Sequence, residues 1–397
     1  MSALKKHHWL GILFVLGGIL IAVILFSAPS KSESPVYIKQ NQAEDMKNET
    51  ANIDVATDSG PKKPTPPPPV YVATPEPLKA IYMTSWVAGT PSWRKDLMQF
   101  IDESEANAIV IDVKDYTGYV SFDTDNQAIQ ELGSIENRIP DIQSFIRELN
   151  DRGIYTIARI SVFQDPYFVK QRPDLAVKTL NGAVWKDRKG ISWVDMGAKE
   201  YWDYIVEIAK ASHEVGFDEI NFDYIRFPSD GNMKDISYDY YDEVNVTKAE
   251  ALEQFFAYLS REVKPLGIPI SADLFGMTTS NYDDLGIGQV LERAAPHFDY
   301  IAPMVYPSHY PPTFIGLASP AHHPYEVIYY AMTKGVERLI AASSSPSKLR
   351  PWIQDFDLGA TYDAAMIRQE MQAVYDAGLT SWMSWDPSNK YTRDAYR

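Results

Sequence analysis

Eight short apolar segments with the composition of β-strands alternate with amphipathic segments over the last 320 or so residues of this 397-residue chain. The predicted strands are Ala80 to Trp86, Ala108 to Lys114, Tyr155 to Val162, Glu219 to Arg226, Ile268 to Phe275, Tyr300 to Tyr306, Leu349 to Asp355 and Thr380 to Trp385. Such alternation predicts a parallel sheet, and eight strands in about 320 residues fit a closed (β/α)8 TIM barrel. An open doubly wound sheet is the rival, but no glycine-rich phosphate loop follows the first strand.

Apolar residues at helical spacing indicate helices between these strands. Five sets have this spacing: Leu97, Phe100 and Ile101; Ile142, Phe145, Ile146 and Leu149; Trp202, Ile205, Val206 and Ala209; Leu252, Phe255, Phe256 and Leu259; and Ile287, Val290, Leu291 and Ala294. Only about a dozen residues follow the last predicted strand. The eighth helix of the barrel must therefore be short or absent.

The N-terminus predicts a membrane anchor. Lys5 and Lys6 precede 18 uncharged residues, Trp9 to Phe26, about the minimum that crosses a bilayer as a helix. Lysines on the N-terminal flank hold that end inside, so the rest of the chain is exported. The residues around Ala28 make a poor signal-peptidase site, which favours an uncleaved anchor over a cleaved signal peptide. We expect residues 1–27 to form a single-pass anchor in the cell membrane, with the rest of the chain extracellular.

Composition divides the rest of the chain in two and excludes several functions. Residues 28–77 are polar and proline-rich and predict a disordered linker, which leaves residues 78–397 for the barrel domain. A net charge of −16 argues against nucleic acid as a partner. The absence of cysteine excludes disulfides, thiolate nucleophiles and cysteine-bound zinc. We expect a monomer without a cofactor.

Carboxylates gather at the C-terminal ends of the predicted strands, where a barrel of this kind keeps its active site. The segment Phe222 to Pro228 is the most informative, since a buried strand ends there in Asp223, two aromatic residues and Arg226. Other strands end in, or lead to, further polar residues: Asp112, Lys114, Asp115, Arg159, Asp165, Asp273, Tyr306, Asp355, Trp385 and Asp386. The long connections 164–196 and 229–246 both leave such ends, and we expect them to wall the same cleft.

Two carboxyl groups on neighbouring strands are the signature of glycoside hydrolysis, which needs one protonated acid and one nucleophile or base. Asp223 and Asp273 lie on consecutive predicted strands and suit the short separation of a retaining pair. We expect Arg226 to keep Asp223 ionised, and the apolar neighbours of Asp273 to raise its pKa, as an acid requires. Asp112 or Asp115 paired with Asp223 is the next choice.

Other chemistries find less support in the sequence. No Gly-x-Ser-x-Gly elbow of a serine hydrolase is present. His309, His322 and His323 could ligate a metal, but no His-Glu-x-x-His helix accompanies them, so no metal site is predicted.

Several motifs resemble the glycosyl hydrolase barrels of a bacterial family long catalogued as a domain of unknown function and related to amylase-like and chitinase-like barrels. The matching segments are Ala80 to Tyr82, Ile111 to Asp115, Trp193 to Gly197, Gly216 to Pro228, Tyr300 to Pro307 and Trp385 to Tyr391. The resemblance implies a TIM barrel with a glycosidase site. It also implies Asp223 as nucleophile and Asp273 as acid/base, as in amylase-like relatives, although the acid there is usually Glu. The chitinase-like position fails to match, because Glu219 lies near the start of its strand.

These observations predict a glycoside hydrolase that acts on an extracellular or cell-wall polysaccharide, with Asp223 and Asp273 as the catalytic pair. The expected substrate-binding residues are Asp112, Lys114, Asp115, Arg159, Tyr224, Arg226, Tyr306, Trp385 and Asp386. The alternative is a barrel that binds glycan without cleaving it, as a surface carbohydrate-binding module. A transglycosylase is a third possibility that the sequence cannot separate from a hydrolase.

Overall fold

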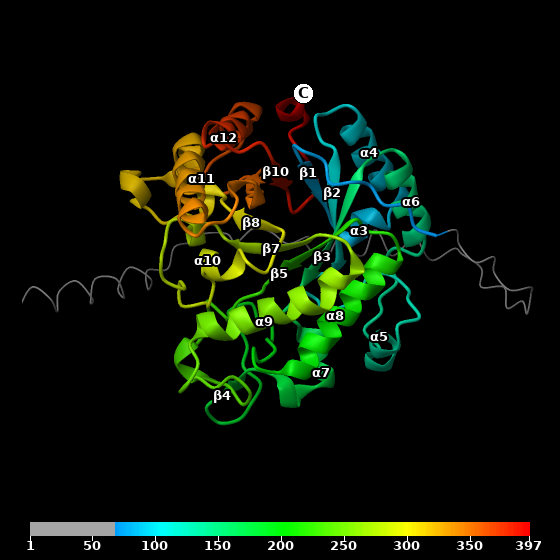
Figure 1. Cartoon of the computed structure of the whole chain (residues 1–397), viewed down its shortest axis with the longest axis vertical. Helices are drawn as coiled ribbons and strands as arrows, with labels where there is room; N and C mark the ends of the chain where they lie inside the picture. The colour runs from blue at the N-terminus through cyan, green and yellow to red at the C-terminus, as the bar shows by residue number, and fades with distance from the viewer. Residues whose placement is uncertain (1–67) are drawn as a thin grey trace, which may run out of the picture. The chain divides into compact units, whose positions relative to one another are not determined.

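The computed structural model describes residues 68–397, and within them eight parallel strands close into a barrel (Figure 1). The strands are β1 (Lys79–Met83), β2 (Ala108–Lys114), β3 (Tyr155–Ser161), β5 (Glu219–Asp223), β7 (Ile270–Phe275), β8 (Tyr300–Met304), β9 (Trp352–Gln354) and β10 (Trp382–Trp385). They follow one another around the barrel in chain order, and β1 closes it by pairing with both β2 and β10. All eight predicted strands are confirmed.

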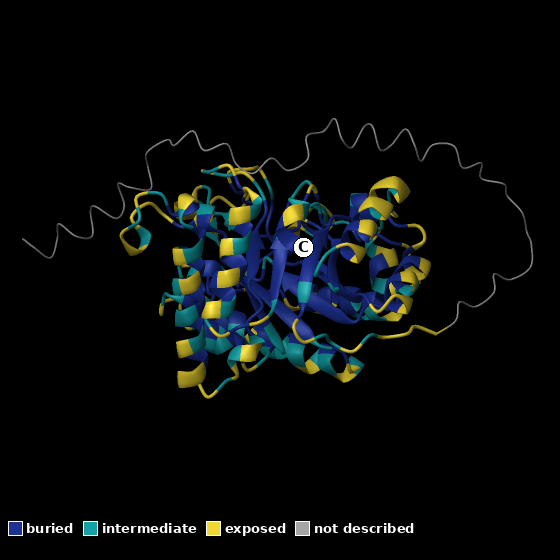
Figure 2. Cartoon of the chain, turned by 90° about the horizontal axis from the view of Figure 1, so that it is seen from above, coloured by how far each residue is buried: buried dark blue, intermediate teal, exposed yellow. Residues whose placement is uncertain are grey.

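Helices surround this barrel, with their outward faces exposed and the strands buried (Figure 2). The α-helices are α3 (Ser85–Ala88), α4 (Pro91–Asp102), α5 (Gln127–Leu132), α6 (Ile142–Asp151), α7 (Pro166–Gln171), α8 (Lys199–Glu214), α9 (Lys248–Val263), α10 (Leu291–Ala294), α11 (Pro324–Ala341) and α12 (Ala364–Asp376). The 3-10 helices are η1 (Pro173–Leu175), η2 (Met233–Asp235), η3 (Lys264–Leu266), η4 (Gly276–Thr279), η5 (Pro307–His309), η6 (Phe314–Gly316), η7 (Pro320–His322), η8 (Pro346–Lys348) and η9 (Arg393–Tyr396).

The helices agree with the periodic sets except at one place. The predicted helix around Ile287 to Ala294 is only the short α10, because Gly286 and Gly288 have positive φ angles and hold the preceding residues in a turn. Two further long helices, α11 and α12, lie outside the five periodic sets. After β10 only η9 follows, as expected from the short C-terminal segment.

The helix starts show local sequence control. At α9 the hydroxyl of Thr247 accepts from the backbone N–H of Glu250, whose carboxylate accepts from Thr247 in return, a complete capping box. At α7 the Asp165 carboxylate accepts from the backbone N–H of Phe168 at 2.8 Å, and Pro166 takes the first helical position. The long loops after β3 and β5 therefore begin or end at well-defined caps.

Residues 68–77, which the sequence assigns to the linker, lie against the N-terminal end of the barrel. The backbone N–H of Val72 donates to Asp218 at 2.6 Å, and the hydroxyl of Thr74 donates to that of Tyr155 at 3.1 Å. Leu78 is fully buried next to the barrel core. The proline-rich composition hid these contacts, because they depend mainly on backbone groups and a few apolar side chains. The predicted anchor, residues 1–27, and linker residues 28–67 lie outside the described part. Within 68–397 no helix has the length and apolarity needed to cross a bilayer.

Candidate active site

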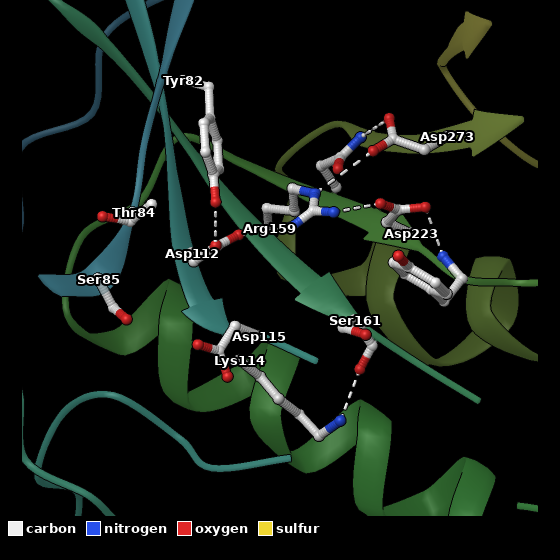
Figure 3. A network of polar contacts seen from close by, with 12 residues as sticks. Tyr82, Thr84, Ser85, Asp112, Lys114, Asp115, Arg159, Ser161, Asp223 and Asp273 are labelled. Carbon is white, nitrogen blue, oxygen red and sulfur yellow. Dashed lines mark hydrogen bonds and ion pairs between the residues drawn. The ribbon is translucent and has the colours of Figure 1, made fainter. Parts of the chain in front are cut away.

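Arg159 of β3 lies at the centre of three carboxylates from neighbouring strands (Figure 3). Its Nη1 donates to Asp112 of β2 at 2.6 Å, and its Nη2 forms a close ion pair with Asp223 of β5. Its Nε lies 3.6 Å from Oδ2 of Asp273 of β7. These four side chains are almost completely buried in the C-terminal halves of four adjacent strands. One guanidinium group thus gathers both predicted catalytic residues and a third carboxylate.

Asp223 is the last residue of β5, and the backbone turns sharply after it. Tyr224 has a φ of 53°, in the left-handed region that a residue with a side chain seldom adopts. The turn points the backbone N–H of Tyr224 back at Oδ1 of Asp223, 2.5 Å away. Strain of this kind persists only where the surroundings enforce it, and it is concentrated at functional sites.

Asp273 lies deeper in the barrel and is held by neutral donors. Its Oδ1 accepts from Nδ2 of Asn221 at 2.9 Å and from the indole Nε1 of Trp352 at 2.8 Å. Burial and then the charge of Asp223 raise the pKa of Asp273 to about 8, against the opposing effects of Arg159 and these two donors. The raised pKa agrees in direction with the sequence-based expectation, and it makes Asp273 a protonated acid at neutral pH.

Asp112 completes the cluster and connects it to an aromatic stack. The hydroxyl of Tyr82 donates to Asp112, and burial raises the pKa of Asp112 above its usual value. The Trp385 ring stacks on the Tyr82 ring, with centroids 3.8 Å apart, and the guanidinium of Arg159 lies 5.0 Å from the Trp385 ring. Tyr306 belongs to the same buried apolar cluster as Tyr82, with Trp385 packed against it, and burial followed by the charges of Asp273 and Asp223 raises the pKa of Tyr306 well above the usual value. This side of the cluster is therefore lined by rings, as sugar sites often are.

Two other predicted site residues, Lys114 and Asp115, form ion pairs with partners outside the cluster. Lys114 is fully buried, with its ammonium in an ion pair with Asp165 at 2.9 Å and a hydrogen bond to the backbone oxygen of Ser161. Asp115 accepts from Arg138 at 2.7 Å. Lys114 is thus held in an ion pair outside the Arg159 cluster, whereas the charge of Asp115 is close enough to help raise the pKa of Asp112.

Two more predicted residues hold the loops around the site. Asp386 accepts from the backbone and hydroxyl of Ser388 in the turn after β10. The guanidinium of Arg226 lies over the rings of Trp193, Tyr224 and Phe275, at 4.8, 5.3 and 4.8 Å. Arg159 forms an ion pair with Asp223, whereas the sequence led us to expect that Arg226 would stabilise the charge of Asp223. Spacing along one strand suggested Arg226, whereas pairing between strands brings in Arg159.

The two long connections contact each other next to the cluster. Their short strands β4 (Lys178–Thr179) and β6 (Ile236–Ser237) pair antiparallel. Asp195 of the first connection accepts from the backbone N–H groups of Asp239, Tyr240 and Tyr241 of the second. The Trp193 ring lies 6.1 Å from that of Tyr224, which follows Asp223. The connections thus form one unit at the C-terminal end of β5, on the side where the sequence placed them.

Sequence reasoning missed three residues of the cluster as site residues: Tyr82, Asn221 and Trp352. Each lies in a predicted strand, and Asn221 precedes Asp223 by two positions. Since side chains alternate along a strand, Asn221 and Asp223 share the inward face, and this period-two relation was the available signal. Among the residues that the structure describes, no group of His, Asp or Glu side chains is arranged to hold a metal ion.

A closed parallel barrel with clustered carboxylates at the C-terminal halves of its strands defines a class of barrel enzymes to which many glycosidases belong. The chain belongs to the family described as "Putative glycosyl hydrolase domain", which matches residues 80–391. Glycoside hydrolysis is accordingly the general activity that the family supports.

Several solved structures are similar to this chain. A hypothetical protein from Ruminiclostridium thermocellum is 33% identical, with a TM-score of 0.45, and the match covers 52% of this chain and 98% of that one. The PgaB (BpsB) glycoside hydrolase domain from Bordetella bronchiseptica is 14% identical, with a TM-score of 0.59 and coverage of 81% and 99%. Alpha-L-fucosidase isoenzyme 2 from Paenibacillus thiaminolyticus is 12% identical, with a TM-score of 0.53 and coverage of 81% and 48%. The last two support the barrel fold. No curated protein matches the chain.

Proposed function

We propose that this protein hydrolyses a cell-wall or other extracellular polysaccharide by a retaining mechanism, with Asp223 as nucleophile and Asp273 as acid/base. The observation that supports this assignment is the pairing of a carboxylate and a raised-pKa carboxyl group on one guanidinium. A glycosidase needs just this division between a charged and a protonated group. Both groups contact the same guanidinium, Asp223 through Nη2 and Asp273 at 3.6 Å from Nε, which keeps the two carboxyl groups close together, as a catalytic pair requires.

In the first step, Asp273 gives its proton to the glycosidic oxygen while Asp223 attacks the anomeric carbon, and the bond to the leaving sugar breaks. The product is a covalent glycosyl ester on Asp223. Asp273, now a carboxylate, then takes a proton from water as the water oxygen attacks the same carbon, which releases Asp223 and restores both groups. The rings of Tyr82, Trp385 and Tyr306 supply apolar surface beside this reaction.

Hydrolysis of a panel of cell-wall and storage glycans by the full 397-residue chain tests the proposal. We expect reducing sugar from at least one glycan, and a loss of ~10³-fold or more in kcat for Asp223→Asn and for Asp273→Asn, because each removes a reacting group. The control is Asp125→Asn, the same change at an exposed aspartate outside the cluster. The anomer released first, read by NMR before it equilibrates, reports retention or inversion.

The alternatives are outcomes of the same experiment. If wild type and both variants bind a glycan equally well and none yields product, the protein is a glycan-binding barrel and not a hydrolase. Products longer than the substrate, lost in Asp223→Asn, would indicate a transglycosylase.

We also propose that the enzyme is a monomer anchored in the cell membrane with its barrel outside. The support is the uncharged run Trp9 to Phe26 behind Lys5 and Lys6, and the polar, proline-rich residues that follow it. Protease added to intact cells should then remove the barrel while a tag before Lys5 stays protected. Protection of the barrel in intact cells would refute this orientation, and light scattering of the detergent-solubilised protein checks the oligomeric state.

A further inference from the structure

Arg159 contacts the proposed nucleophile and the proposed acid in different ways. Its Nη2 is in a close ion pair with Asp223, whereas its Nε stands 3.6 Å from Oδ2 of Asp273, beyond hydrogen-bond distance. This Nε–H is buried and makes no hydrogen bond, although an unpaired buried donor is costly. A donor is thus kept available beside Asp273 while that group holds its proton.

The proposed reaction moves a negative charge between these two contacts. At the start Asp223 is the carboxylate and Asp273 is neutral. When the glycosyl ester forms, Asp223 becomes neutral and Asp273 becomes the carboxylate, and hydrolysis of the ester reverses both changes. Without a nearby cation, each buried charge would carry a large desolvation cost.

We infer that Arg159 is a positioning residue that pairs through Nη2 with Asp223 before the ester forms and through Nε with Asp273 while the ester exists. This inference rests on the proposed function and deepens it. The guanidinium group needs only a small shift to close the 3.6 Å gap, since both contacts come from one planar fork. The proton transfer and the attack thus proceed without leaving an unpaired buried carboxylate.

The remaining contacts of Arg159 keep it in place through the cycle. Nη1 donates to Asp112 at 2.6 Å, and Asp112 is held from its other oxygen by Tyr82. The Trp385 ring covers the guanidinium at 5.0 Å. Asp112 therefore acts as the fixed anchor of the arginine, while the contacts to Asp223 and Asp273 alternate. This role differs from the sugar-binding role that the sequence analysis gave to Arg159 and Asp112.

NMR of the full-length protein tests the inference without any substrate. Carbon-13 labelling of the aspartate carboxyl groups follows Asp273, and the Hε resonance of Arg159 reports on hydrogen bonding at Nε. The charged or titratable groups that face Asp273 are Asp223, Arg159 and Tyr306. The variant Asp223→Asn imitates the neutral ester.

We expect the Arg159 Hε resonance to move downfield as Asp273 ionises, because a carboxylate at Oδ2 draws in the Nε–H. In Asp223→Asn we expect the pKa of Asp273 to fall by about one pH unit or more, since a like charge is removed while Arg159 stays. Arg350, paired with Glu219 at 2.9 Å and also buried, provides a second Hε resonance for general effects of pH. An Arg159 resonance that does not respond to the ionisation of Asp273 would overturn the inference.

Kinetics with a cleavable glycan provide the second test. Arg159→Lys keeps the charge but loses the fork, so we expect kcat to fall by about 10- to 100-fold with KM little changed. Arg350→Lys is the matched exchange in the other buried pair and should leave kcat near wild type. A higher KM with an unchanged kcat for Arg159→Lys would instead indicate that Arg159 binds the sugar. If the Arg159 Hε resonance follows the ionisation of Asp273 but the protein cleaves no glycan, the proposed function is refuted. If the protein cleaves a glycan but the resonance does not follow this ionisation, only the present inference is refuted.

Discussion

Replacing Asp273 by Asn should make the protein inactive and more stable at the same time. The pKa of Asp273 is about 8 in the folded protein, against 3.8 for an ordinary Asp. The folded state therefore holds a proton that the unfolded state releases between these two pH values, and stability falls as pH rises through this window. Each pH unit corresponds to about 1.4 kcal/mol, so ionisation of the unfolded chain costs up to about 4 kcal/mol at pH 7.

An Asn at position 273 removes this cost because the amide has no charge to lose. Its oxygen can still accept from Asn221 and Trp352, at 2.9 and 2.8 Å. Its nitrogen would replace Oδ2, which lies 3.6 Å from Nε of Arg159, and this contact between two donors reduces the gain in stability. We expect Asp273→Asn to raise the free energy of unfolding by about 2 to 4 kcal/mol at pH 7.

Urea unfolding of wild type and Asp273→Asn at pH 5, 7 and 8.5 checks this prediction. The difference between the two should grow from about 1 kcal/mol at pH 5 to its largest value above pH 8, and then level off. Asp218 and Asp355, whose pKa values burial raises to about 6, are present in both proteins and cancel in the difference. A difference that is constant from pH 5 to 8.5 would show that Asp273 does not hold the proton in this range.

Three further predictions follow from neighbouring contacts. Asp195→Ala leaves the backbone N–H groups of the second long connection without an acceptor, and should lower unfolding free energy by about 1 to 3 kcal/mol and speed proteolysis within residues 229–246. Lys114→Met leaves Asp165 buried without its cation and should destabilise by about 3 to 5 kcal/mol in urea, whereas unchanged stability would count against a structural ion pair. Tyr82→Phe removes the donor to Asp112 and should raise its pKa further, as carboxyl NMR can detect; a lower value would contradict the role of this hydrogen bond.

The barrel could be predicted from the sequence because its signals are local. Every strand is a short apolar run, and burial on both faces of a parallel sheet demands just such runs. The helix predicted around Ile287 to Ala294 is longer than the observed α10. The apolar spacing there is helical, but Gly286 and Gly288 take positive φ angles, which the spacing does not reveal. The contacts of residues 68–77 depend largely on backbone N–H and C=O groups, which composition cannot reveal.

The site was predictable only as far as strand ends identify it. Asp223 and Asp273 were found because each is a carboxylate in an apolar strand. Lys114 is likewise a charged residue in an apolar strand. Because side chains alternate along a strand, Asp112 and Lys114 would point to the same face of β2 if the strand were regular. The register shift between these two residues turns Lys114 to the other face, where it pairs with Asp165 away from the cluster.

The partner of Asp223 shows what sequence spacing cannot supply. Arg226 is three residues away along the chain, whereas Arg159 is 64 positions away. In the barrel, however, Arg159 is the register partner of both Asp112 and Asn221 on the strands at either side. Two positions after Asn221 comes Asp223, on the same inward face, and its neighbour β7 contributes Asp273. A cation on the strand between two carboxylate strands can reach both, so β3 is the position from which one arginine can serve Asp112, Asp223 and Asp273 together.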